Sequence, residues 1–140
     1  MPELTDLASI AAAVRAARTV AVLGAHHDPS RAAFYVPDYL HEKGLRVLPV
    51  NPAMAGKSLW GRPVRETLAS LGEPVDIVDV FRRPELLPGH LEDLLAMRPL
   101  PKLVWLQQGI RNPVFAHDLI AAGIDVVQDR CLLVDHRAMV

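Results

Sequence analysis

The sequence has little of several features that would mark particular classes of protein. Its 140 residues include one cysteine, Cys131, which excludes an internal disulfide framework and fits a reducing compartment. The formal net charge is −1, which argues against a nucleic acid or an anionic membrane as the main partner, because both require a basic excess. No apolar run reaches the roughly 18 residues of a membrane span, and the first residues lack the basic region of a signal peptide. We therefore expect a cytoplasmic protein.

The composition is that of a folded globular chain. Hydrophobic residues make up 51% of the sequence and charged residues 22%, which excludes a disordered protein. A chain of 140 residues is long enough for one domain with its own core. We expect a single domain over residues 1–140, with an N-terminal helix within residues 1–17 packed on it.

The most informative stretch leads from a buried strand into a turn. Residues 19–23 are all apolar or β-branched, as in a strand that is buried on both faces. Gly24 ends this run, and Asp-Pro-Ser at 28–30 predicts a helix that begins at Arg31. Such an arrangement forms the first half of a nucleotide-binding βαβ unit, where free backbone N–H groups favour a phosphate. The alternative is a plain turn that binds nothing.

Strand and helix patterns then alternate with short connections. They place further strands over 45–50, 75–80, 102–106 and 124–128, and helices over 31–43, 84–97 and 112–122. Between them the pattern predicts an extended piece within 57–64 and a short helix over 67–71, and after Cys131 only a short tail. The alternation favours parallel strands with right-handed crossovers. The predicted fold class is α/β, a single Rossmann-like domain with a parallel sheet and helices on both faces.

A dinucleotide site is poorly provided for. Gly24 is followed by Ala25, His26 and His27, so the second and third glycines of the dinucleotide-binding pattern are missing. The strand over 45–50 is followed by Asn51 and Pro52, with no carboxylate for the ribose of NAD. The sequence therefore disfavours NAD(P) but leaves a phosphate-bearing nucleotide open.

Several segments resemble the CoA-binding protein family, whose members are similar to the N-terminal domain of the succinyl-CoA synthetase alpha subunit. The segments that carry the resemblance are 20–24, 49–52, 75–85, 104–109 and 129–131. The most specific are DIVDVFRRPE at 76–85 and WLQQG at 105–109. The resemblance implies a stand-alone domain that binds coenzyme A or an acyl-CoA. Because the phosphorylatable histidine of the synthetase belongs to a second domain that has no counterpart here, the resemblance implies binding without an established reaction.

The resemblance also assigns roles to individual residues. It implies that the turn from Gly24 through Ala25 and His26 to Arg31 binds phosphate, with Ser30 and Arg31 as side-chain donors. It implies that Asn51 and Pro52 border the adenosine, and that Lys57 lies near a lysine position of the synthetase. It implies that the groove is lined by Val80, Phe81 and Arg82, and that the pantetheine arm is held by Gln107, Gln108 and Gly109.

No set of residues predicts catalysis or a metal site. His26 and His27 are adjacent in an extended loop and are expected to point apart, and no cluster has metal-ligand spacing. Cys131 follows a strand but has no partnered base in the sequence, so an inert thiol is favoured. Asp76 and Asp79 point in different directions from one strand and are not expected to form a carboxylate pair.

Two further functions remain open. One is an enzyme with an NAD(P)- or acyl-CoA-dependent reaction that uses Cys131 or a histidine. The other is a regulatory or interaction module that senses a nucleotide. The acyl group, any physiological partner and the oligomeric state are not determined by the sequence. For Gly24 we expect a valine substitution to spare the fold and to abolish CoA binding by a clash with the ligand.

Overall fold

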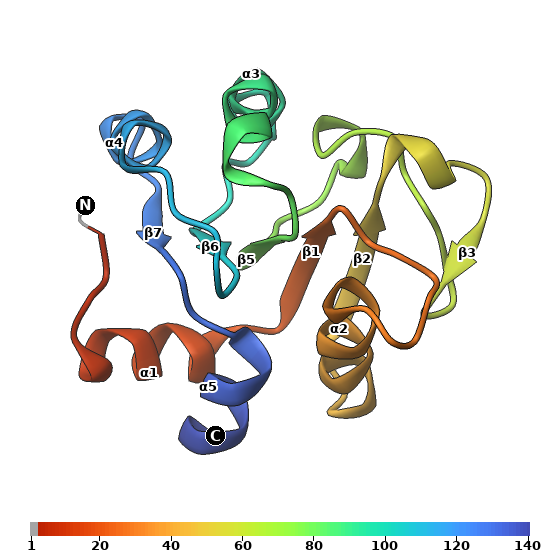
Figure 1. Ribbon diagram of the computed structural model, residues 1–140, viewed down its shortest axis with the longest axis horizontal. Coiled ribbons are helices and arrows are strands. Elements are labelled where there is room, and N and C mark those ends of the chain that lie inside the picture. Colours follow the sequence, from red (N-terminus) through yellow and green to blue (C-terminus); the bar gives the residue numbers. More distant parts are fainter. Residues whose placement is uncertain (1–2) are drawn as a thin grey trace.

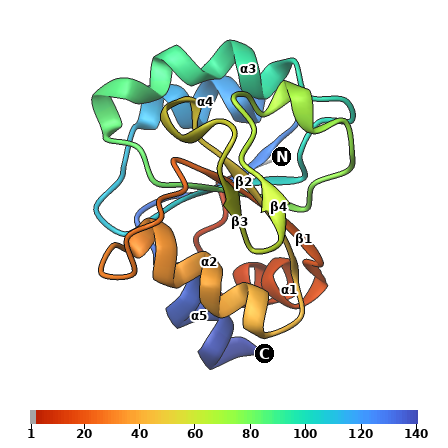
Figure 2. The same ribbon diagram turned by 90° about the vertical axis from the view of Figure 1, so that its right-hand side faces the viewer.

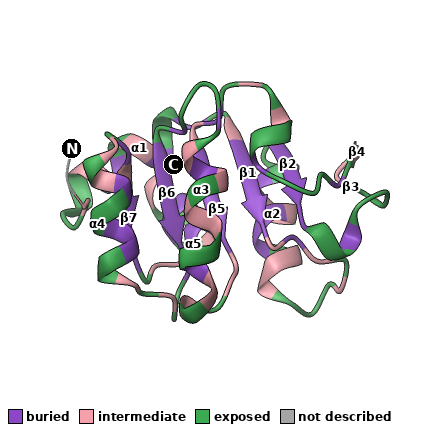
Figure 3. Ribbon diagram, turned by 90° about the horizontal axis from the view of Figure 1, so that it is seen from above, coloured by how far each residue is buried: buried purple, intermediate pink, exposed green. Residues whose placement is uncertain are grey.

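The computed structural model describes residues 3–140 and contains one five-stranded parallel sheet with the order β2-β1-β5-β6-β7 (Figure 1). The strands are β1 (Thr19–Leu23), β2 (Arg46–Val50), β5 (Ile77–Val80), β6 (Leu103–Leu106) and β7 (Asp125–Val127). They are buried along most of their length and appear as the purple centre of Figure 3. The prediction of a parallel sheet is confirmed, and the bounds of β1 are those expected from the sequence.

Helices cover both faces of the sheet, so the structure confirms the α/β, Rossmann-like fold class (Figures 1 and 2). One face carries α1 (Leu7–Ala16), α2 (Ala32–Glu42) and α5 (Leu132–Met139). The other face carries α3 (Leu91–Leu95) and α4 (Pro113–Ala121). Within residues 3–140 no helix combines the length and the apolar character that crossing a membrane would require.

Helix α2 begins one residue later than predicted and is not capped by the Asp-Pro-Ser group. Its N-cap is Arg31, whose side chain makes no capping hydrogen bond, while the Asp28 carboxylate accepts from the Ser30 amide at 3.0 Å. Pro37 lies inside the helix and has no N–H to donate to the Ala33 carbonyl. That carbonyl instead accepts from the His26 amide at 3.3 Å. The proline therefore frees an acceptor that ties the Gly24 turn to the helix.

The connection from β2 to β5 is more elaborate than predicted. The extended piece expected within 57–64 is a small antiparallel hairpin of β3 (Ser58–Leu59) and β4 (Arg62–Pro63), which lies beside β2 at the side of the sheet (Figures 1 and 3). A 3₁₀ turn precedes it at Pro52–Met54, and the short helix expected over 67–71 is a single 3₁₀ turn at Ala69–Leu71.

Two predictions about the second half of the chain are wrong. The helix expected over 84–97 is a 3₁₀ helix at Pro84–His90 followed by α3, because Pro88 lacks the N–H that a continuous α-helix would need. The residues after Cys131, expected to be a short tail, form α5. Its buried side includes Asp135, which binds Arg130 through two hydrogen bonds of 2.6 and 2.9 Å.

Both outer edges of the sheet are paired with short segments outside its strands. Along β2, the Arg65 amide donates to the Pro49 carbonyl at 3.0 Å, and Arg65 forms a parallel bridge with Val50. Along β7, the Leu4 amide donates to the Val126 carbonyl at 2.7 Å. Each edge strand therefore has part of its outer backbone hydrogen bonding satisfied.

Candidate functional site

The candidate site lies at the carboxyl end of the sheet, where the strand order reverses between β1 and β5. The chain leaves β1 toward β2 on one side and returns to β5 on the other side. Ligands of open parallel sheets bind at such a switch point. Two hollows flank it, one on the side of α2 and α5 and one on the side of α3.

The α2 hollow collects six of the fourteen binding residues predicted from the sequence. It is lined by the first residues of α2, by the segment after β5 and by the loop after β6. The predicted residues among its lining are Arg31, Phe81, Arg82, Gln107, Gln108 and Gly109. Tyr35, Ile110 and Cys131 line the same hollow. The structure thus brings together three loops that are far apart in the sequence.

The α3 hollow lies on the opposite side of the switch point. Its lining includes the end of β1 at Leu23, the predicted residue Pro52 and the segment Glu66 to Thr67. His90 and Asp93 come from the 3₁₀ helix and α3. Lys57 is exposed and lines neither hollow, and Val80 is fully buried with its side chain in the core.

The Gly24 turn does not offer the free amides that the sequence suggested. Gly24 has φ +91°. Its N–H donates to the Val50 carbonyl at 2.9 Å, and the Ala25 N–H donates to the same oxygen at 3.3 Å. These two amides hold the turn against the end of β2. Available donors lie instead at the start of α2, where Ala32 and Ala33 are the first helical residues and line the α2 hollow.

The polar side chains of the turn are held within it. The rings of His26 and His27 stack with centroids 4.7 Å apart, so the prediction that they point apart is wrong. The amide of Asp28 donates to His26 Nδ1 at 3.0 Å, and this hydrogen bond draws the chain back on itself. The Ser30 hydroxyl, predicted as a phosphate donor, instead donates to the Asp28 carboxylate at 2.8 Å.

Asn51 connects the loop after β2 to the Gly24 turn. It is buried, its Nδ2 donates to the Ala25 carbonyl at 2.9 Å, and its Oδ1 accepts from the Ala53 amide at 3.0 Å. Both the nitrogen and the oxygen of the Asn51 side-chain amide are therefore hydrogen-bonded within the protein. Its role in the structure is to fix the relative positions of two loops.

The loop after β6 is fixed in a similar way. Gln107 is buried, and its Oε1 accepts from the Leu132 amide at 2.9 Å, which anchors the start of α5. The Gly109 amide donates to the Asp129 carboxylate at 2.7 Å. Gln108 is exposed and lines the α2 hollow, so its side-chain amide faces solvent.

Arg82 crosses the switch point and connects the two hollows. Its Nε donates to His90 Nε2 at 3.2 Å. Its Cδ lies 3.1 Å from where a Cβ on Gly24 would be. Burial lowers the pKa of His90, and the neighbouring Arg82 charge acts in the same direction, whereas Asp93 opposes it. His90 was not among the site residues predicted from the sequence, although it follows Arg82 by eight residues in the segment predicted as a helix over 84–97.

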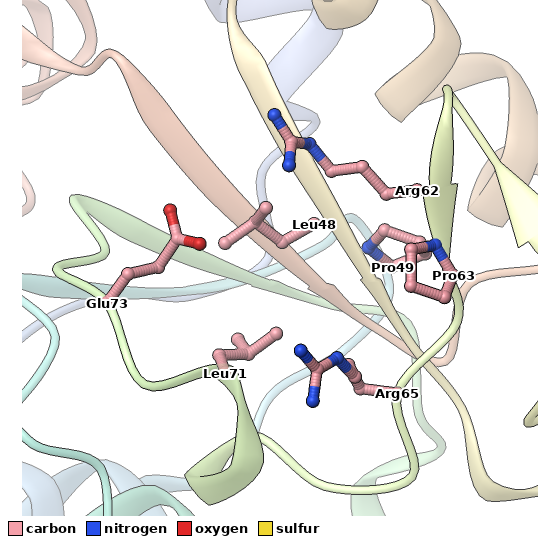
Figure 4. A pocket seen from close by; sticks show the side chains of 7 residues that line it. All are labelled: Leu48, Pro49, Arg62, Pro63, Arg65, Leu71 and Glu73. Carbon is pink, nitrogen blue, oxygen red and sulfur yellow. The ribbon is translucent and has the colours of Figure 1, made fainter.

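A separate hollow against β2 is lined by Glu73 together with Arg62 and Arg65 (Figure 4). Glu73 accepts two hydrogen bonds from Arg46, at 2.6 and 2.9 Å. These bonds hold the pKa of Glu73 below its usual value, and Arg62 and Arg65 act in the same direction. The lining of this hollow is apart from the switch point, and its arginines stabilise a carboxylate of the protein itself.

No group of three or more His, Cys, Asp or Glu side chains within residues 3–140 is placed to hold a metal ion. Cys131 is half-buried at the N-cap of α5. Its neighbour Arg130 is occupied by Asp135, and the Arg130 carbonyl accepts from the Trp105 indole at 2.7 Å. The Asp129–Cys131 segment is thus fixed to the sheet and to α5.

Comparison with known proteins points to one family. A family model described as a CoA binding domain matches residues 18–137. The uncharacterized protein YneT of Bacillus subtilis is 32% identical over 129 residues, which cover 92% of this chain and 93% of that protein.

Solved structures show the same fold. A protein from Thermus thermophilus is 53% identical and superposes with a TM-score of 0.92 over 97% of this chain and 100% of that chain. A dinucleotide-forming acetyl-coenzyme A synthetase from Ca. Korarchaeum cryptofilum is 19% identical, with a TM-score of 0.65 over 78% of this chain and 25% of its own. The likeness to the synthetase is one of fold.

Proposed function

The chain belongs to the CoA binding domain family, and from this membership we propose that it binds coenzyme A or an acyl-CoA across the switch point between β1 and β5. The observation that carries the proposal is the α2 hollow. Arg31 and Arg82 line it together with Ala32 and Ala33, the first residues of α2, and with the loop after β6. The single cysteine of the sequence supports a reducing compartment such as the cytoplasm.

The chemistry of the α2 hollow suits the parts of coenzyme A. A diphosphate needs cationic and backbone donors, which Arg31, Arg82 and the first turn of α2 provide. A pantetheine arm carries two amides on an apolar chain. Gln108 supplies an exposed amide, and Phe81 and Ile110 supply apolar surface. In this proposal the adenosine lies toward the α3 hollow, beside Pro52.

Calorimetric titration with CoA, acetyl-CoA, NAD and NADP tests the proposal directly. CoA or acetyl-CoA is expected to bind more tightly than either dinucleotide, because the dinucleotide glycine pattern and the carboxylate after β2 are missing. Tighter binding of NAD than of CoA would overturn the proposal. Turnover of acetyl-CoA in the same samples would favour the enzyme reading in which Cys131, on the wall of the α2 hollow, takes part.

Removal of a guanidinium from the α2 hollow is expected to weaken CoA binding. Charge-assisted hydrogen bonds to phosphate contribute roughly 1.5–3 kcal/mol, so Arg31→Ala is expected to raise Kd about ten-fold or more. The matched control is Arg62→Ala, which removes a guanidinium from the separate hollow beside β2. Titration of both variants with CoA checks the prediction, and equal Kd values for the two would contradict it.

A further inference from the structure

The Arg82–His90 pair stands between the two hollows. Arg82 lines the α2 hollow and His90 lines the α3 hollow. The 3.2 Å hydrogen bond between their side chains therefore lies between the two hollows. The Arg82 side chain also passes over Gly24, with its Cδ 3.1 Å from the Cβ position of that residue. A ligand with one arm in each hollow must pass this pair.

The bond between Arg82 and His90 is the weaker of two that the guanidinium can form. In the structure a cationic donor meets a neutral imidazole at Nε2, so the imidazole proton lies on Nδ1. A phosphate oxygen is a charged acceptor, so its hydrogen bond to the guanidinium is supported by the attraction of opposite charges, which the neutral imidazole does not supply. A diphosphate that binds between the two hollows therefore offers Arg82 a stronger acceptor than His90 does.

We propose that Arg82 exchanges His90 for the diphosphate of the ligand, and that the released His90 takes up a proton from solvent as the ligand binds. This inference rests on the proposed function, since it requires a ligand whose two arms are joined by a diphosphate. Arg82 and His90 are then positioning residues that couple binding to protonation. After the exchange, the His90 Nε2–H faces the diphosphate as a second donor.

The charges around His90 support uptake of a proton. In the free protein, burial and the Arg82 charge hold the pKa of His90 below its usual value. Asp93, on α3, favours the protonated ring, and its carboxylate is fixed by the amides of Leu68 and Ala69 at 2.8 and 2.9 Å. The other titratable groups that line the α3 hollow are Glu66 and Glu92. A bound diphosphate adds negative charge and neutralises Arg82, and both changes raise the pKa of His90.

The test is calorimetry of CoA binding at pH 7 in two buffers that differ in ionisation enthalpy. The protein is expected to take up a fraction of one proton per CoA bound, and its Kd is expected to fall about three-fold or more from pH 8 to pH 6. His90→Gln, which can still accept from Arg82 but does not titrate, is expected to show no uptake. His117→Gln, at an exposed position of α4, is the matched control and is expected to behave like the parent.

Titration with dephospho-CoA, which lacks the 3′-phosphate, distinguishes proton uptake by the protein from protonation changes of the ligand. The 3′-phosphate of CoA itself titrates near pH 6, whereas the diphosphate stays ionised. Uptake that persists with dephospho-CoA and vanishes in His90→Gln supports the exchange. Binding of dephospho-CoA without uptake, or equal uptake by parent and His90→Gln, overturns the exchange and leaves the proposed function standing. Absence of CoA binding at either pH overturns both.

Discussion

Replacement of Gly24 by alanine is expected to lower the free energy of unfolding by at least about 3 kcal/mol. Gly24 has φ +91°, and an added Cβ would lie 2.7 Å from the backbone carbonyl oxygen of Phe81. A side chain at this φ is strained, and the carbonyl is fixed because the Phe81 amide donates to the Leu23 carbonyl at 2.9 Å. Urea denaturation of parent and variant measures the loss.

Gly44→Ala is the matched control for this change. Gly44 has φ +90° at the end of α2, and an added Cβ there meets nothing within 4 Å. Its substitution is expected to cost only the backbone strain, about 1 kcal/mol. Equal losses for the two variants would show that the close approach of Phe81 to Gly24 is unimportant.

This result differs from what the sequence alone suggests for Gly24. From the sequence, a side chain at Gly24 is expected to spare the fold and to clash with the ligand. In the structure the first atom to be met is the carbonyl of Phe81, at the end of the neighbouring strand. Loss of CoA binding in a Gly24 variant would therefore report on the fold as well as on the site.

Replacement of Asp79 by leucine, which has a similar shape, is expected to raise the free energy of unfolding at pH 7 by at least about 2 kcal/mol. Asp79 lies on β5 between Val22 and Trp105 and is fully buried. Neither carboxylate oxygen has a hydrogen-bond partner in the part of the chain that the structure describes. Burial raises the pKa of Asp79 well above its usual value, because the apolar surroundings disfavour the charged carboxylate in the folded protein.

The pH dependence of stability distinguishes this explanation from better apolar packing. Because the folded pKa of Asp79 lies above the unfolded one, its unfavourable contribution is smallest below about pH 4. It grows by about 1.4 kcal/mol per pH unit as the pH rises toward the folded pKa. The difference in stability between Asp79→Leu and the parent should therefore be larger at pH 8 than at pH 5 in urea denaturation. A constant difference would contradict the prediction.

Asp79→Asn is a useful control because it removes the charge and keeps a buried polar group. It is expected to remove the pH-dependent part of the difference and to retain the cost of an unsatisfied amide. If the free energy of unfolding at pH 5 rises strongly in Asp79→Leu but not in Asp79→Asn, the increase at that pH is caused by removal of a buried polar group.

The parallel sheet could be predicted because its signals are local. The β-branched and apolar run of β1 is short and ends at Gly24, and such a run indicates a buried strand. Trp105 belongs to the strand predicted over 102–106, and it is fully buried on β6. The loops that gather at the α2 hollow follow from the same pattern, since parallel strands bring their carboxyl ends to one edge of the sheet.

The features that were missed depend on contacts between distant residues. Helix α5 has Asp135 and His136 on its buried side, so it lacks an apolar stripe, and its partners include Arg130 and Tyr39. The amides of the Gly24 turn are used by Val50, which only the register between β1 and β2 determines. His90 reaches the switch point through the bend at the end of a 3₁₀ helix, for which helical periodicity gives no signal.

The paired edges of the sheet restrict how the protein can associate with itself. An open edge strand is a template for aggregation through added β-strands. Here Pro49, the next-to-last residue of β2, provides no backbone donor, and the Arg65 segment covers the end of that strand. On the opposite side, the residue before Leu4 forms a parallel bridge with Val126 of β7. Self-association by extension of the sheet would have to displace these segments first, so growth of intermolecular β-structure from the native state is expected to be slow.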